Sequence, residues 1–105
     1  MALIWNFEKR CGTVTMKDGF TRYMYEGNAF FVLLNEWKED GEEMYSLYTF
    51  AVDLAHAKRC ARDAVYDNVV SVVLYKDVCR EWKKISTFFA EYCDDVTITY
   101  KKGAE

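Results

Sequence analysis

Residues 12–52 decide the fold, and they read GTVTMKDGFTRYMYEGNAFFVLLNEWKEDGEEMYSLYTFAV. Asp-Gly and Gly-Asn pairs separate segments in which apolar and polar residues alternate. Such pairs favour hairpin turns, because glycine and asparagine tolerate positive φ angles. A third turn is expected over residues 38–43. Together with an upstream apolar segment, the pattern predicts a β-meander with strands at residues 3–7, 12–17, 20–26, 29–37 and 44–52.

The second half of the chain changes to a helical period. Alanine-rich residues 54–65 predict a helix capped by Asp53, and apolar residues at spacings of three and four predict a second helix over residues 78–93, capped by Asp77. Two further strands are expected at residues 68–75 and 96–100, the first of them covered on both faces. We therefore expect one α+β domain over residues 1–105, ordered βββββ-α-β-α-β, in which a mixed sheet begins as a four- to five-strand meander and two helices pack on one face.

Composition narrows the functional class. The chain has 105 residues, 51% of them hydrophobic, and a net charge of -3. A chain this apolar folds, and its acidic balance argues against a generic binder of nucleic-acid backbones. The longest apolar stretch, residues 69–75, is too short for a membrane span, and the N-terminus has no signal-peptide pattern. We expect a cytoplasmic protein with no membrane partner.

Catalytic and metal-binding patterns are sparse. The single histidine, His56, precedes Cys60 by one helical turn, and an enzyme built on this pair is the third hypothesis. The four cysteines contain no CxxC motif, and no glycine-rich phosphate loop occurs. We expect no metal, no cofactor and no catalytic residue.

The sharpest local feature is the third turn. Residues 36–43 carry five acids against Lys38, a local balance of -4. Carboxylates on a protruding turn can occupy a basic groove in place of phosphates, and flanking aromatic residues can anchor the contact. The competing interpretation is a solvated turn that keeps a hydrophobic hairpin soluble. The predicted partner-binding residues are Glu36, Trp37, Glu39, Asp40, Glu42, Glu43 and Tyr45.

Basic residues concentrate in the second half. Residues 1–53 have a net charge of -4 and residues 54–105 have +1. If the two predicted helices lie side by side, their bases form an alternative patch for nucleic acid. This patch consists of Lys58, Arg59, Arg62, Arg80, Lys83 and Lys84. A homodimer is also expected to be possible, through edge pairing of residues 3–7 or 96–100.

Three stretches resemble small uncharacterised proteins of bacterial phages and mobile elements. They are residues 5–9 leading into residues 12–16, residues 27–30, and residues 48–53 with His56 and Cys60. The resemblance implies a context in which small acidic proteins inhibit host enzymes, including nucleic-acid-guided nucleases. The leading hypothesis is a non-enzymatic, anti-CRISPR-like interaction module that binds a basic groove on a host protein through its acidic hairpin. The alternative is a nucleic-acid-binding accessory protein.

Overall fold

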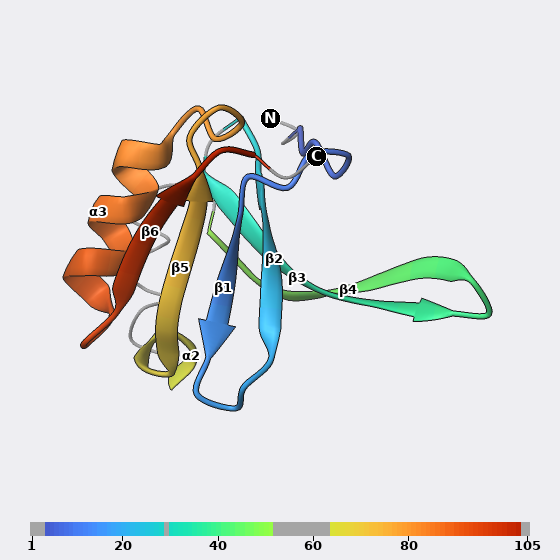
Figure 1. Cartoon of the computed structure of the whole chain (residues 1–105), viewed down its shortest axis with the longest axis horizontal. Coiled ribbons are helices and arrows are strands. Elements are labelled where there is room, and N and C mark those ends of the chain that lie inside the picture. Colours follow the sequence, from blue (N-terminus) through green and yellow to red (C-terminus); the bar gives the residue numbers. More distant parts are fainter. Residues whose placement is uncertain (1–3, 29, 52–63, 104–105) are drawn as a thin grey trace.

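The computed structural model describes residues 4–28, 30–51 and 64–103, and six strands in this part form one mixed sheet in the order β4-β3-β2-β1-β5-β6 (Figure 1). Strands β1 to β4 pair as consecutive antiparallel hairpins, β5 pairs antiparallel with β1, and β6 lies parallel to β5. The elements are β1 (Gly12–Met16), β2 (Thr21–Glu26), β3 (Phe31–Glu39), β4 (Glu42–Ala51), α2 (Ala64–Asp67), β5 (Val69–Tyr75), α3 (Trp82–Tyr92) and β6 (Thr97–Lys101).

The predicted fold class, with two helices packed on the sheet, is wrong. In the described part of the chain, only α3 is longer than about one turn. The other helix, α2, has four residues and is too short to cover the sheet. Most of the first predicted helix, residues 54–65, lies outside the described residues. The protein as described is mostly β, and its one helix of more than a turn, α3, connects the parallel strands β5 and β6.

The prediction of a strand at residues 3–7 is wrong for the described residues 4–7. Within the described residues 4–7, only Trp5 makes a β-bridge, to Gly27. The Trp5 side chain instead packs against Tyr25, Val32 and Leu34 on the sheet. The indole ring of Trp5 is partly buried there.

The second predicted helix begins later than expected. It starts at Trp82 with Glu81 as its N-terminal cap residue, whereas Asp77 was the predicted cap. The backbone N–H groups of Val78 and Cys79 both donate to the Tyr75 carbonyl, so the chain makes a turn there first. Asp77 accepts a hydrogen bond from the backbone of Gly103 and is not available to the helix.

The hydrophobic core lies between α3 and one face of the sheet. Phe88 and Phe89 of α3 are fully buried against the alternate strand residues Val14, Leu33 and Val72. The prediction that residues 68–75 are covered on both faces is wrong, because Val70 is exposed and Val73 only half-buried. Val69, Val72 and Leu74 of β5 are buried in the core, whereas Val70 and Val73 are not.

The β3–β4 hairpin is longer than predicted and extends beyond the rest of the sheet (Figure 1). Pairing continues to Glu39 and Glu42, so the turn contains two residues and not the six of the predicted turn at residues 38–43. Asp40 and Gly41 have φ angles of 53° and 82°. Two positive φ angles are the requirement of a type I′ turn, whose twist matches the strands and lets them pair up to the tip.

Candidate functional site

The distal part of this hairpin, residues 36–45, is called the arm below. Every residue from 37 to 47 is exposed, including the aromatic and aliphatic ones. All seven predicted partner-binding residues lie on the arm, so the structure brings together the whole set. Exposed apolar side chains that cluster on a projecting hairpin are typical of interaction surfaces.

The strand register divides the arm into two faces. Trp37 lies opposite Met44, and Glu39 lies opposite Glu42. Directly opposed residues of an antiparallel pair share one face, and residues two apart on a strand share it too. We call this set of four residues the Trp37 face. The intervening residues Glu36, Lys38, Glu43 and Tyr45 form the opposite side, the Tyr45 face.

Charges on the Tyr45 face are largely compensated within the protein. The Glu36 carboxylate accepts a hydrogen bond from Arg10 at 2.6 Å and another from the Tyr25 hydroxyl. The Arg10 guanidinium also stacks 4.0 Å from the centre of the Tyr23 ring. Lys38 lies opposite Glu43, and opposite charges in such pairs attract. This side of the arm is therefore close to neutral.

The contacts at Glu36 also shift two pKa values. Hydrogen bonding to Glu36 raises the pKa of Arg10 above its usual range. Burial, followed by the hydrogen bond to Glu36, raises the pKa of Tyr25 to about 12. Both residues keep their protons at neutral pH, and the base of the arm is fixed to β2 and to the N-terminal segment.

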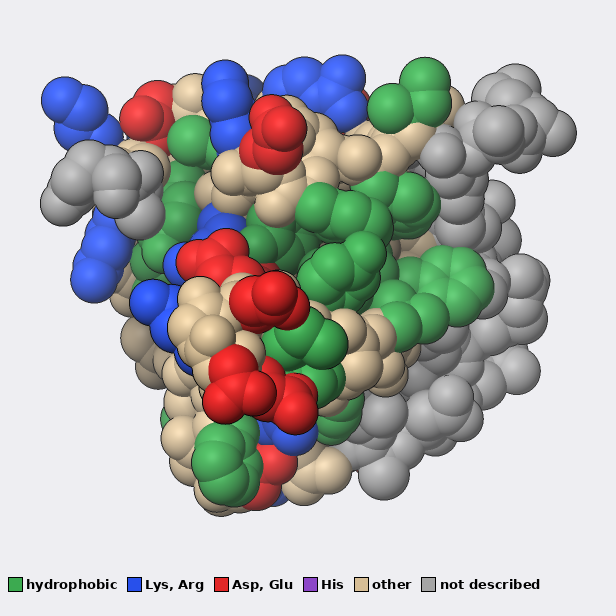
Figure 2. Space-filling view, turned by 90° about the vertical axis from the view of Figure 1, so that its right-hand side faces the viewer, with side chains coloured by type: hydrophobic (Ala, Val, Ile, Leu, Met, Phe, Trp, Pro, Cys, Tyr) green, Lys and Arg blue, Asp and Glu red, His purple; other side chains and the backbone are tan. Residues whose placement is uncertain are grey.

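The Trp37 face is both apolar and acidic. Trp37 is 45% exposed and Met44 37% exposed. Beyond them lie Glu39 and Glu42, and the indole Nε1 of Trp37 donates to Glu39 Oε2 at 3.4 Å. Neither carboxylate has a basic residue opposite it in the register. Figure 2 looks at this end of the molecule, where acidic side chains gather with hydrophobic side chains beside them.

Sequence reasoning treated the arm as one acidic turn and missed this division. Met44 was not a candidate, although the period of two along the strands places it beside Trp37. Trp37 and Tyr45 were expected to act together as anchors, yet they lie on opposite faces. Glu36 was counted with the free acids, whereas its carboxylate already binds Arg10 and Tyr25.

Only part of the alternative basic patch lies among the described residues. Lys58, Arg59 and Arg62 lie outside the described residues, as do His56 and Cys60. Arg80 donates to the Gly27 carbonyl at 2.9 Å and pairs with Glu26, and Lys84 pairs with Glu81 at 3.3 Å. Only Lys83 of the three described bases is without an ion pair in the part of the chain that is described.

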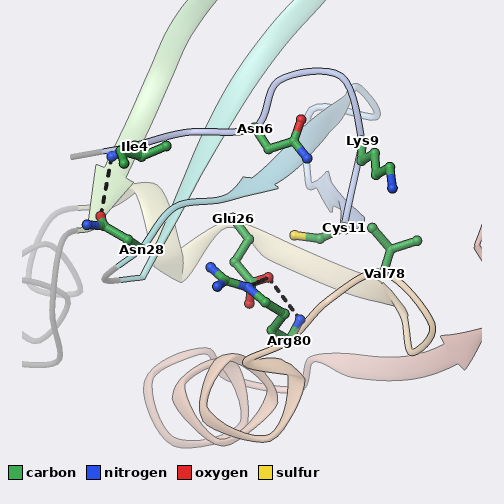
Figure 3. Close-up of a pocket in the computed structure, with 8 residues that line it drawn as sticks. All are labelled: Ile4, Asn6, Lys9, Cys11, Glu26, Asn28, Val78 and Arg80. Carbon is green, nitrogen blue, oxygen red and sulfur yellow. Dashed lines mark hydrogen bonds and ion pairs between the residues drawn. The ribbon is translucent and has the colours of Figure 1, made fainter.

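Sequence reasoning also missed a buried carboxylate. Glu26, at the end of β2, is 8% exposed and lines a pocket of about 490 Å³ between the N-terminal segment and the start of α3 (Figure 3). Its two oxygens accept the backbone N–H groups of Arg80 at 2.9 Å and Glu81 at 2.5 Å. Glu26 therefore caps α3 from a distant strand, and its acceptor positions are used structurally.

Comparisons with known proteins do not place the chain. No family model, curated protein or solved structure matches it. The resemblance to phage proteins thus stays a prediction. Among residues 4–28, 30–51 and 64–103, no group of three metal-ligating side chains occurs, and no helix there has the length and hydropathy of a membrane span.

The described thiols are expected to be poor nucleophiles. Cys11, Cys79 and Cys93 are all buried. The pKa of Cys11 is raised by its hydrogen bond with Cys79 and by burial, and burial together with Asp67 and Asp94 raises the pKa of Cys93 to about 12. Because the thiolate is the reactive form, iodoacetamide at pH 8 should modify Cys11 and Cys93 at least about tenfold more slowly in the native protein than in denaturant. Peptide mass spectrometry measures each rate, and fast native modification of Cys11 or Cys93 would contradict the expectation.

Proposed function

We propose that the protein is a non-enzymatic interaction module that inserts its arm, Trp37 face first, into a basic groove of a partner protein. The observation that carries the proposal is the register. It places two exposed apolar side chains and two carboxylates without basic cross-strand partners on one face of a projecting hairpin.

Each part of the Trp37 face has a role in this binding. Tryptophan is enriched among the residues that contribute most to interface affinity, so Trp37, supported by Met44, is the anchor. Glu39 and Glu42 complement basic side chains and accelerate encounter with a positive groove. The ion pair of Arg10 with Glu36 holds the base of the arm, which reduces the ordering required on binding.

The partner that fits this chemistry is a protein whose basic groove ordinarily holds phosphates. Carboxylates spaced along a narrow β-ribbon can enter such a groove as a substitute for a nucleic-acid strand. The resemblance to phage proteins supports an inhibitor role, directed against a nucleic-acid enzyme of a host defence system.

Neighbouring glutamates on opposite faces provide a matched test. Glu42→Gln and Glu43→Gln remove the same charge one residue apart, but only Glu42 lies on the Trp37 face. Partners are captured from nuclease-treated bacterial lysate, identified by mass spectrometry, purified and titrated with each variant. We expect Glu42→Gln to weaken binding by about fivefold to tenfold and Glu43→Gln by less than about twofold.

Trp37→Ala tests the apolar half of the same face. Loss of a central tryptophan anchor should weaken binding by roughly 30-fold or more. Equal effects of the two glutamine variants, or full affinity of Trp37→Ala, would show that the partner does not bind the Trp37 face.

A further inference from the structure

Four lysines and two aromatic rings gather where β5 and β6 end. The two strands are parallel, and the Lys76 backbone N–H donates to the Lys101 carbonyl at 3.0 Å, which keeps the chain ends side by side. Helix α3 begins nearby with Trp82. We call this cluster the basic end, and it consists of Lys76, Lys83, Lys101, Lys102, Trp82 and Tyr100.

The rings and two of the lysines are in contact. Trp82 and Tyr100 meet edge to face with ring centres 5.3 Å apart. The Lys76 ammonium lies 5.0 Å from the centre of Trp82 and 5.9 Å from that of Tyr100, and the Lys83 ammonium lies 5.6 Å from Trp82. Cation–π attraction therefore holds two positive charges beside one pair of rings.

The lysines of the basic end are not neutralised by acids in the described part of the chain. None of the four takes part in an ion pair there. Of the two nearest acids in sequence, Glu81 pairs with Lys84, whereas the Asp77 carboxylate keeps its charge while it accepts the Gly103 N–H. The four ammonium groups outnumber this one carboxylate, so the basic end stays net positive and can attract an anionic ligand.

The acidic arm lies too far away to cancel this charge. Sheet order puts β4 and β6 at opposite edges with four strands between them, and the arm projects away from the rest of the sheet (Figure 1). Charges separated by more than about 10 Å are largely screened at 0.1 M salt. The net charge of -3 therefore does not describe the potential at the basic end.

We propose that the basic end binds single-stranded nucleic acid. Lys76, Lys83 and Lys102 contact phosphates, Lys101 adds positive charge from the opposite face of β6, and Tyr100, which is 42% exposed, offers a ring on which an unpaired base stacks. Bases of a duplex are already stacked on one another, so this combination favours single strands. This inference is independent of the proposed role of the arm, because the two surfaces share no residue.

The test is fluorescence anisotropy with labelled dT12 and rU12 over a range of salt concentrations. Each phosphate contact on a single strand contributes a slope of about -0.7 to log K against log salt, so three or four contacts predict a slope of about -2 to -3. Lys76→Ala/Lys83→Ala should weaken binding by about tenfold and flatten the slope by about 1.4. Lys17→Ala/Lys38→Ala, which removes the same charge from the β1–β2 turn and from β3, should change affinity less than about twofold.

Tyr100 variants separate base stacking from simple anion binding. Tyr100→Ala should weaken binding by about fivefold or more, and Tyr100→Phe should keep most of the affinity because it retains the ring. Circular dichroism of each variant verifies the fold. No binding at 20 mM salt, equal loss in the two double-lysine variants, or full affinity of Tyr100→Ala together with equal competition by inorganic polyphosphate would overturn the proposal.

Discussion

Glu26→Ala should lower the free energy of unfolding by about 3 kcal/mol, since it leaves the partly buried backbone N–H groups of Arg80 and Glu81, at the start of α3, without acceptors. Domains of this size are stable by only about 5–15 kcal/mol, so the loss is a large fraction of the total. Urea denaturation followed by circular dichroism measures the change. The melting temperature should fall by roughly 12–20 °C.

Arg80→Ala is the matched control, because it removes the ion pair with Glu26 but keeps the backbone N–H that Glu26 accepts. The Arg80 side chain is 68% exposed, and exposed ion pairs contribute about 0–1 kcal/mol. We therefore expect Arg80→Ala to cost less than about 1 kcal/mol. If Arg80→Ala destabilised the protein as much as Glu26→Ala, the guanidinium and not the backbone cap would be the main partner of Glu26.

Raising the pH above about 8 should lower the free energy of unfolding of this protein. The native pKa values of Cys93 and Tyr25 are raised to about 12, and that of Cys11 is raised as well. In the unfolded chain these groups ionise near pH 8.5 (Cys) and 10 (Tyr), so between those values and pH 12 the native state holds more protons. Their stabilising contribution is complete below about pH 8 and is lost as pH rises, by up to about 1.4 kcal/mol per pH unit for each group.

Urea unfolding at intervals from pH 8 to 11 in reducing buffer measures this loss, and we expect the free energy of unfolding to fall continuously over this range. The Cys11→Ala/Cys93→Ala variant controls for lysine titration, because it lacks two of the three groups. Its stability should fall less steeply over the same range. Identical slopes for the variant and the natural sequence would contradict the assignment of the effect to the buried thiols.

Local chemistry was the predictable part of this fold. Asp40-Gly41 and the alternating residues on either side of it specify a hairpin through interactions between near neighbours. For the same reason the acidic and aromatic residues of the arm could be listed as candidates before their geometry was known. Side chains alternate between the two faces of a strand, so a turn of two residues places Trp37 and Tyr45 on different faces. This assignment could have been predicted if the length of the turn had been known.

Contacts between distant segments were not predictable in this way. Asp77 matched the pattern of a helix cap, but the group that caps α3 is the carboxylate of Glu26, more than 50 residues earlier in the chain. The basic end likewise depends on parallel pairing of β5 with β6, which brings Tyr100 to Trp82 and Lys76. No sequence motif marks either arrangement, because each exists only after the sheet has formed.

The order of strands in the sheet also determines how this protein approaches other molecules. In the described part of the chain, the free carboxylates of the arm lie beyond the β4 edge of the sheet and the lysines of the basic end lie at the β6 edge, so opposite charges are separated across the sheet. In the field of a charged surface such a molecule rotates before contact, so that the hairpin tip leads toward positive surfaces and the ends of β5 and β6 lead toward negative ones. The sheet thereby selects the orientation of encounter as well as the residues that touch.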